Sequence, residues 1–346
     1  MKGLLAPVAA LVAAITVITA FLALSGDSPA ATLALFFSRP FSSWWHFGNL
    51  LNGAALLMIA ATGSSLALRS GSFNLGGEAQ IYAPALVTAL ILSSDLWPSD
   101  LSAAGAVLPF AAAALAATIS GAALAAVPAA LRSRRGVSEL LSSFLFSAAT
   151  LPILDYLVGG PLRDQSKNLL ATAPVAKAFR LPPLADPSLF NVSFFVALAV
   201  AVAAALFLTK TKAGFRLGVT GVAPEFARFS GFRTGRIAAA TLTVSGALHG
   251  LAGFFSVTGT WYLCHQGHSG GMGWSALAVA LIAGKGPYAI IPAALVFSWL
   301  EAASDSALLS ARFGFDSTSI VQAILLLVIS ARLTRVRSAT SRPRSA

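Results

Sequence analysis

Polar and ionisable residues within otherwise apolar stretches are the ones whose types could do chemistry. Glu78 and Glu139 open two such stretches, and His249 lies in the middle of a third. Inside a membrane span such groups are costly unless they face a cavity or a partner. They therefore predict a polar path through the apolar region. The predicted path residues are Asn74, Glu78, Gln80, Glu139, Ser142, Ser143, Ser147 and His249.

Each of these groups also has a structural interpretation. Glu78 could cap the first turn of its own helix, where the helix dipole favours a carboxylate. The serines could donate to carbonyls of their own helices, and for them we favour this interpretation. For Glu78 and Glu139 the sequence leaves both interpretations open. Asp155 and Glu301 lie near the outer ends of their stretches and are interpreted as interfacial residues.

The apolar stretches that must position these residues dominate the chain. Of its 346 residues, 57% are hydrophobic and only 10% are charged, whereas a soluble domain has about a quarter of its residues charged. We therefore predict an all-α polytopic membrane protein, a single domain over 1–346 with about ten spans of about 20 residues. The spans are predicted near 4–24, 48–68, 73–94, 104–130, 137–158, 190–209, 237–259, 274–284, 288–303 and 318–333.

The charge distribution predicts an orientation. A net charge of +11 could indicate nucleic-acid binding, but in a membrane protein basic residues more often mark the cytoplasmic side. Counted on alternate sides of the ten spans, 17 of the 23 Lys and Arg residues fall on one side. We therefore expect no nucleic-acid partner and place both termini, including the basic tail 334–346, in the cytoplasm.

The first span could be mistaken for a cleaved signal peptide because it follows Lys2. Its apolar run of about 20 residues is longer than a typical signal-peptide core, so we interpret 4–24 as an uncleaved anchor. The only cysteine, Cys264, can form no internal disulfide.

Two Gly-rich polar segments each precede a short apolar helix. They are FNLGGE at 73–78 and HSGGMGW at 268–274. Glycine lets the backbone turn tightly or lets another helix approach closely. In the predicted topology the two helices run in opposite directions, as expected of an inverted-repeat transporter with its substrate near the repeat interface. The alternative is two unrelated Gly-rich turns.

The longest charged connection on the predicted cytoplasmic side is 210–236. Pro224 followed by Glu225 predicts a helix start, and Gly231 would stop this helix after Ser230. Exposed aromatic residues on such a short helix suggest a partner protein, and the alternative is an amphipathic helix lying on anionic lipid. The side chains that it would project are Phe226, Arg228 and Phe229.

Five segments occur in the order found in one known family. The chain resembles bacterial ABC-transporter permeases of the simple-sugar and nucleoside class, relatives of the branched-chain amino acid permeases. The FNLGGE form is most similar to nucleoside-type members, a branch that also resembles riboflavin permeases. The resemblance covers roughly residues 45 to 305. The segments are FNLGGEAQIY, VSELLSS, KAGFRLGVTGVAPEFARFSGF, TVSGALHGLAGFFSVTG and GMGWSALAVALIAGKGP.

The resemblance implies one subunit of an importer in the bacterial cytoplasmic membrane. Two permeases would form the path, cytoplasmic ATPases would use ATP and Mg, and an extracytoplasmic binding protein would deliver the substrate. The family's ATPase-coupling pattern, E-A-A-x-x-x-G, departs from this chain at Phe226, and His249 and Ser147 also differ from the residues expected. The implied coupling residues are Pro224, Glu225, Phe226, Ala227, Arg228, Phe229 and Gly231.

Other chemistry finds little support in the sequence. The phosphate-binding pattern GxxxxGK[ST] is absent, so we expect no ATPase activity and no bound cofactor in this chain. The pair His265 and His268 lies on a predicted outer loop without nearby ligands and is a poor metal site. The outer loop 159–189 is either a docking surface for the binding protein or an ordinary solvated loop.

Two functions of different class remain. The first is the ABC permease, importing a small neutral solute: most readily a nucleoside or a riboflavin-like compound, then a simple sugar. The second is a stand-alone ion-coupled carrier with Glu78 or Glu139 as its proton-binding group. The sequence leaves open whether the second permease is a copy of this chain.

Overall fold

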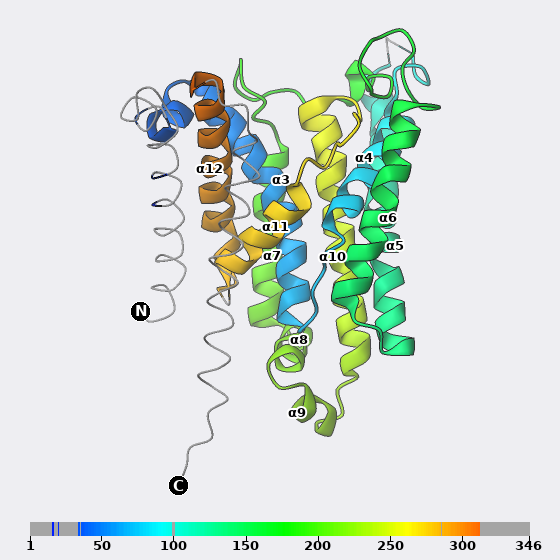
Figure 1. The fold of residues 1–346 in the computed structure, drawn as a ribbon, viewed down its shortest axis with the longest axis vertical. Coiled ribbons are helices and arrows are strands. Elements are labelled where there is room, and N and C mark those ends of the chain that lie inside the picture. Colours follow the sequence, from blue (N-terminus) through cyan, green and yellow to red (C-terminus); the bar gives the residue numbers. More distant parts are fainter. Residues whose placement is uncertain are drawn as a thin grey trace.

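The computed structural model describes residues 36–98, 101–284 and 286–311, together with Thr16, Ala20 and Ala34. The predicted spans at 4–24 and 318–333 and the tail at 334–346 lie outside the described residues. Within the described ranges the regular structure is helical, and Figure 1 shows most helices running along one common direction. The elements are η1 (Arg39–Phe41), α3 (Trp44–Arg69), α4 (Gly77–Leu92), α5 (Ala103–Arg135), α6 (Glu139–Gly159), η2 (Lys177–Phe179), α7 (Ser193–Lys210), α8 (Lys212–Val222), α9 (Pro224–Phe229), α10 (Thr234–Ser256), η3 (Val257–Trp261), α11 (Met272–Ala283) and α12 (Ile290–Ala311).

The prediction of an all-α polytopic membrane protein agrees with these helices. Each of the eight predicted spans between 48 and 303 falls on one of them. Five described helices, α3, α5, α6, α7 and α10, are long and apolar enough to cross a membrane. The helices α4 and α11 have 16 and 12 residues, so they rise about 24 Å and 18 Å, less than the roughly 30 Å of a bilayer core. The count of ten spans and the inverted repeat stay predictions.

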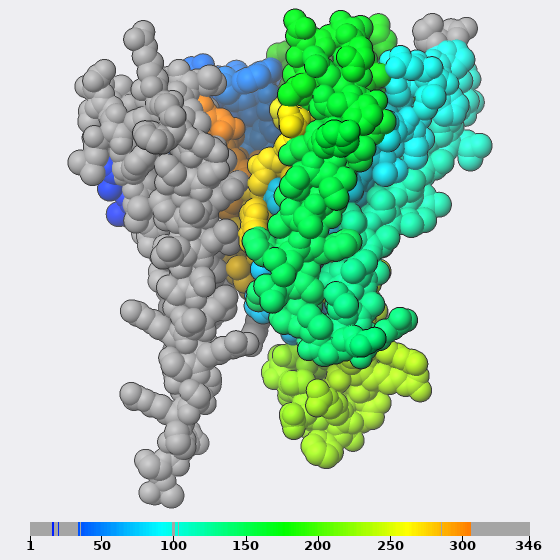
Figure 2. Space-filling view, turned by 45° about the vertical axis from the view of Figure 1, so that its right-hand side comes forward, coloured from blue at the N-terminus to red at the C-terminus, as the bar shows by residue number. Residues whose placement is uncertain are grey.

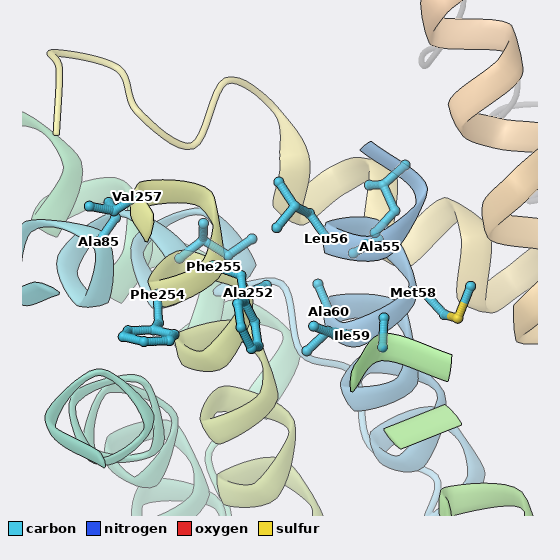
Figure 3. Close-up of a cluster of buried hydrophobic side chains, with 14 of the residues drawn as sticks. Ala55, Leu56, Met58, Ile59, Ala60, Ala85, Ala252, Phe254, Phe255 and Val257 are labelled. Carbon is cyan, nitrogen blue, oxygen red and sulfur yellow. The ribbon is translucent and has the colours of Figure 1, made fainter. Parts of the chain in front are cut away.

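Helix α3 lies at the centre of the described bundle and packs against α7, α10, α11 and α12. Its middle is almost completely buried, with Met58, Ile59 and Ala60 inaccessible to solvent. Figure 3 shows these side chains and Leu56 on one helix and Phe254 and Phe255 of α10 on another, within one buried hydrophobic cluster. A helix that is apolar on every side is suited to such a position.

Helices α5 and α10 approach each other closely because small residues line their contact. A Cβ on Gly121 of α5 would overlap the carbonyl oxygen of Gly246 in α10, and one on Gly250 would overlap that of Ala117. The spacing in each helix is four residues, the small-xxx-small arrangement of membrane helix pairs. Dispersion contacts between the two backbones therefore hold α10 against α5.

The basic ends of three long helices lie at one end of the molecule. Arg69 ends α3, Arg135 ends α5 and Lys210 ends α7. The short helices α8 and α9 project beyond these ends, at the bottom of Figure 1. The outer loop 159–189 and η1 lie at the opposite end. This arrangement agrees with the predicted grouping of basic residues, and the assignment of that end to the cytoplasm stays a prediction.

Candidate functional site

The two Gly-rich segments singled out in the sequence meet in space. Helices α4 and α11 both begin part-way along the bundle (Figure 1). A Cβ on Gly77 would lie 2.9 Å from the Cα of Gly273, and a Cβ on Gly273 would lie 2.5 Å from the backbone nitrogen of Glu78. Since no side chain fits in either position, glycine is what allows the first turns of the two short helices to touch.

The carboxylate of Glu78 joins these two helix starts. Its Oε2 accepts the backbone amide of Gly271 at 3.2 Å and its Oε1 accepts that of Trp274 at 3.1 Å. The side chain lies in the first turn of α4, and the residue is only 7% exposed. One negative charge thus lies at the positive ends of two helix dipoles and satisfies amides that have no partner within α11. Glu78 was interpreted as a possible cap of its own helix, and the structure shows it capping the start of the neighbouring helix α11.

A reciprocal amide pair fixes the segment before α4. The Asn74 Nδ2 donates to the Gln80 Oε1 at 2.6 Å, and the Gln80 Nε2 donates back to the Asn74 Oδ1 at 3.1 Å. Asn74 also donates to the Ser245 Oγ of α10 at 2.9 Å and accepts from the Gly76 nitrogen at 3.0 Å. Both residues are buried. These bonds hold 72–76 outside helical geometry, so α4 begins at Gly77, four residues after the predicted span.

Three acceptors on one face of α6 take up the backbone amides of the same region. Glu139 accepts from the nitrogen of Phe73 at 3.4 Å, Ser143 from Leu75 at 3.0 Å and Ser147 from Ala79 at 3.1 Å. Positions four residues apart lie on one face of a helix, and irregular backbone within an apolar bundle needs such partners. We call Glu139, Ser143 and Ser147 the α6 acceptor row.

Ser142 points away from the acceptor row and donates to the Ser138 carbonyl at 2.9 Å in its own helix. That is the structural interpretation the sequence favoured for the serines. Ser143 does the same with Leu140 at 3.3 Å in addition to its contact with Leu75.

Glu139 also forms an ion pair with Arg132 that was not predicted from the sequence. Arg132 donates to its Oε1 at 2.8 Å and to the Ser72 hydroxyl. The Glu139 side chain is 12% exposed and that of Arg132 34%. Gly136, with φ of +68°, ends α5 in the left-handed conformation and lets the chain reverse, which returns Arg132 to the start of α6. A glycine one residue past a helical pattern that ends in basic residues was the available signal.

His249 is fully buried beside the contact of the two short helices. Its Nδ1 donates to the Ser245 carbonyl at 2.7 Å, and its Nε2 lies 3.4 Å from the Ser64 hydroxyl. A Cβ on Gly77 would lie 3.1 Å from that Nε2. The imidazole therefore fills the space beside Gly77. The role of the eight path residues in lining a solute path stays a prediction, because six of them are buried: Asn74, Glu78, Gln80, Ser143, Ser147 and His249.

Asp155 and Glu301, interpreted from sequence as interfacial, each bind a neighbouring element. The Asp155 Oδ1 accepts the Tyr82 hydroxyl of α4 and the backbone amide of Gly267, both at 2.9 Å. The Glu301 Oε1 accepts the Ser275 hydroxyl of α11 at 2.8 Å. Both carboxylates therefore connect helices within the described bundle.

The short helix predicted between Pro224 and Ser230 is present as α9, with Ser230 as its C-cap. Gly231 follows with φ of +79°. Ala227 is completely buried and anchors the helix, whereas Phe226 is 62% and Phe229 90% exposed. The two charged residues of this helix, Glu225 and Arg228, are exposed, and the Arg228 Nη1 lies 4.0 Å from the Glu225 Oε1. Which of these residues contact a partner stays a prediction.

Helix α8, which precedes α9, was missed from the sequence. It begins after Thr211, whose hydroxyl accepts the Gly214 amide at 3.0 Å as an N-cap. Leu217 on one face is buried, and Phe215 and Val222 are exposed. The sequence signal for this helix was Thr211, an N-capping residue placed directly before a short segment with helical spacing of apolar residues.

The outer loop 159–189 is held by its own hydrogen bonds. Arg163 donates to the carbonyls of Lys167 and Leu169, and Asp164 pairs with Lys167 at 3.6 Å. Two hydrogen bonds from Ser166 lower the pKa of the Asp164 carboxyl from its usual value. Near its middle the loop is paired with the neighbouring outer segment through Ala171 and His265.

The rings of His265 and His268 lie 4.8 Å apart. Among the residues that the structure describes, no group of three or more His, Cys, Asp or Glu side chains could hold a metal ion.

Comparison with known proteins identifies the family. Residues 47–330 match the family described as the permease component of the branched-chain amino acid transport system. The chain is 39% identical over 334 residues to a probable riboflavin import permease protein of Treponema pallidum, covering 96% of this chain and 86% of that one. It is 28% identical to a glucose ABC transporter permease protein of Haloferax volcanii, with coverage of 93% and 86%.

A guanosine ABC transporter permease protein of Bacillus subtilis is 22% identical over 334 residues, with coverage of 95% of this chain and 94% of that one. No solved structure matches the chain. Because the family match and the riboflavin-type relative both span most of its length, the chain belongs to this family of permease components.

Proposed function

We propose that this family member is the membrane permease subunit of an ATP-driven ABC importer for a small neutral solute. The solute is a nucleoside or a riboflavin-like compound in the first place and a simple sugar in the second. The names of the relatives, which specify riboflavin, guanosine and glucose, support this choice. The importer would work by alternating access across the bacterial cytoplasmic membrane.

The observation that carries the proposal is the shape of α9. Ala227 anchors this short helix to the rest of the chain, and Phe226 and Phe229 stand exposed on it beyond the ends of the long helices. Exposed aromatic side chains on a small projecting helix are suited to a groove on a partner protein. The partner that fits is a cytoplasmic ATPase. That subunit, and not this chain, would bind and hydrolyse ATP with Mg.

A push on α9 has a direct route to the contact of the short helices. Residues 230–233 join α9 to α10, which packs against α3, α4 and α5. Within α10, Ser245 accepts a hydrogen bond from Asn74, and His249 packs beside Gly77. Movement of α10 would therefore shift the start of α4, and Glu78 would carry that shift to α11.

The outer loop 159–189 is our proposed docking surface for the extracytoplasmic binding protein. It exposes the apolar side chains Leu169 and Leu170 next to the basic residues Arg163 and Lys167. Its hydrogen bonds would preserve one shape for a partner. A second permease, either a copy of this chain or a related one, would complete the path.

The ion-coupled carrier is not favoured by the geometry of its two candidate carboxylates. Glu139 pairs with Arg132 at 2.8 Å, and Glu78 accepts two backbone amides of the α11 start. A proton-carrying group must lose and regain its proton during each cycle. Both carboxylates are instead engaged in contacts within the chain, Glu139 with a guanidinium group and Glu78 with two backbone amides.

The test is a gentle purification from native membranes, with mass-spectrometric identification of the proteins that accompany the chain. We expect an ATPase and a second permease, and ATP-dependent uptake by the reconstituted complex. The double variant Glu225→Arg, Gly231→Asp should lose the ATPase and the uptake together. It reverses the charge of residue 225 on α9, and it places a side chain at residue 231, whose backbone has the left-handed conformation that favours glycine.

Gly235→Asp is the matched control. It adds the same charge at a glycine that has open space around its Cβ position and no left-handed backbone. A chain that purified alone and moved solute without ATP would contradict the proposal, as would a double variant that transported normally while Glu78→Gln did not.

A further inference from the structure

A groove of about 830 Å³ lies along the outer half of α6. Helix α6 crosses one exposed face of the molecule in Figure 2. Leu151, Asp155, Tyr156 and Gly159 line the groove from α6, and Gln266 lines it from the segment before α11. Its volume falls within the range of pockets for small molecules, about 300–1,000 Å³.

The groove combines apolar walls with two free polar groups. The Asp155 Oδ1 is occupied by Tyr82 and Gly267, whereas its Oδ2 has no hydrogen bond among the described residues. The Gln266 side chain is exposed and has no hydrogen bond within the same part of the chain. The Tyr156 ring, 72% exposed, supplies a flat aromatic surface.

This set of groups selects a type of occupant. A carboxylate oxygen only accepts hydrogen bonds, and an amide side chain both donates and accepts. A free carboxylate oxygen among apolar groups is costly without a donor, so lipid chains are poor occupants. A flat heterocycle with a ring N–H could stack on the phenol, donate to Asp155 and bond in both directions with Gln266.

We propose that this groove is an outer subsite for the transported solute, and that it takes flat heterocycles bearing a ring N–H. The inference rests on the proposed import function and names the class of solute more closely. Riboflavin and guanosine have such a ring; glucose does not. Asp155 is the specificity-determining acceptor, and Tyr156 and Gln266 are the remaining contacts.

Asp155 also connects the groove to both short helices. Its Oδ1 receives one bond from Tyr82 in α4 and one from Gly267, five residues before the start of α11. A solute bound to the other carboxylate oxygen would therefore bear on the two helices that meet at Glu78. The arrangement links occupation of the groove to the element that the import cycle must move.

A cysteine inside the groove gives a direct test. A Cβ on Gly159 would lie 3.9 Å from the Gln266 Nε2, an ordinary contact, so Gly159→Cys should fold normally. The native Cys264 is buried. The reconstituted transporter is treated with N-ethylmaleimide during ATP-driven uptake, with riboflavin, guanosine or glucose added. With riboflavin or guanosine at about ten times its dissociation constant, labelling should slow about tenfold.

Ala104→Cys is the control, because Ala104 is exposed near the outer end of α5 and outside the groove. Its labelling should not respond to any solute. Gly159→Cys labelling that ignores every solute imported by the unmodified transporter would overturn the inference. Labelling that is slow in all conditions would do the same, since the groove would then be covered by lipid or by the second permease.

Asp155→Asn tests the specific contact. Asparagine keeps an acceptor for Tyr82 and Gly267 and replaces the free oxygen by a donor. Loss of a hydrogen bond to a charged group should lower riboflavin or guanosine uptake about 10- to 100-fold, and any glucose uptake should fall by a much smaller factor. An equal fall for all three solutes would assign Asp155 a structural role and overturn the inference.

These results are distinguishable from failure of the proposed function. If the unmodified complex imports none of the three solutes with ATP, the import proposal fails together with the inference. If it imports riboflavin or guanosine, but Gly159→Cys labelling ignores both solutes and Asp155→Asn imports them as well as the unmodified chain, only the groove inference fails.

Discussion

The Glu78 carboxylate in the first turn of α4 accepts the backbone amide of Trp274 in the first turn of α11 at 3.1 Å. The two residues are 196 positions apart in sequence. Because Gly77 and Gly273 bring the two backbones into contact, this hydrogen bond lies at the junction of the two short helices. Displacement of either helix must break it or carry the other helix along.

Replacing Glu78 by glutamine should destabilise the protein. The amide oxygen can still accept one backbone N–H, but the amide nitrogen cannot accept the second, and the charge at the two helix starts is lost. We expect a loss of about 1–3 kcal/mol in stability, measured as a lower Tm in detergent and a matching fall in uptake. An unchanged Tm with abolished uptake would instead indicate a direct role of the carboxylate in transport.

Adding a methyl group at Gly273 should disrupt the junction. The new Cβ would lie 2.5 Å from the Glu78 nitrogen, a backbone atom that cannot move aside. Gly273→Ala should therefore cost about 1–3 kcal/mol, seen as a lower Tm or a reduced yield of folded protein. Gly218→Ala in α8 is the matched control, because nothing lies within 4 Å of its Cβ position. Equal Tm values for the two variants would contradict the close contact.

The single cysteine should be chemically inert in the folded protein. Burial raises the pKa of the Cys264 thiol, so very little of the reactive thiolate forms at neutral or mildly alkaline pH. We expect no mass increase when the native protein is treated with N-ethylmaleimide and full modification after denaturation. Rapid labelling of the native protein would show that the segment before α11 opens readily.

The outer loop should keep its structure in mild acid. Because hydrogen bonds from Ser166 lower the folded-state pKa of Asp164 below its unfolded value, the contribution of this carboxylate is present at neutral pH and is lost only as the pH falls through the lowered pKa. Protection of the amides at 164–167 from hydrogen exchange, taken relative to the intrinsic exchange rate at each pH, should therefore fall on strong acidification and be constant at higher pH. Asp164→Asn should remove this pH dependence, and an unaltered profile in that variant would assign it to another group.

The positions of the long helices could be predicted because apolar runs of span length are local in sequence. The two Gly-rich segments were singled out because glycine permits a tight turn or the close approach of another helix, but the sequence did not indicate that Gly77 would meet Gly273. The partners within that region could not be predicted in the same way. Glu139 and Phe73 lie 66 residues apart, and no local pattern indicates which distant amide a serine or carboxylate will accept.

The partners of the predicted path residues could not be predicted from the sequence either. Composition indicated that polar groups within spans need partners, but it could not distinguish a solute from the chain's own backbone. For Ser143 and Ser147 the structure supplies backbone amides.

Phe226 was correctly expected to be exposed on a short helix, because a proline start and a glycine stop define α9 within a few residues.

The α6 acceptor row makes this part of the chain intolerant of length changes. One residue inserted between Glu139 and Ser143 would turn the rest of α6 through about 100°. The insertion would separate Ser143 and Ser147 from Leu75 and Ala79 in a single step, without removing any of the four residues. Deletions would act in the same way, so a one-codon insertion here should be more damaging than a substitution of either serine.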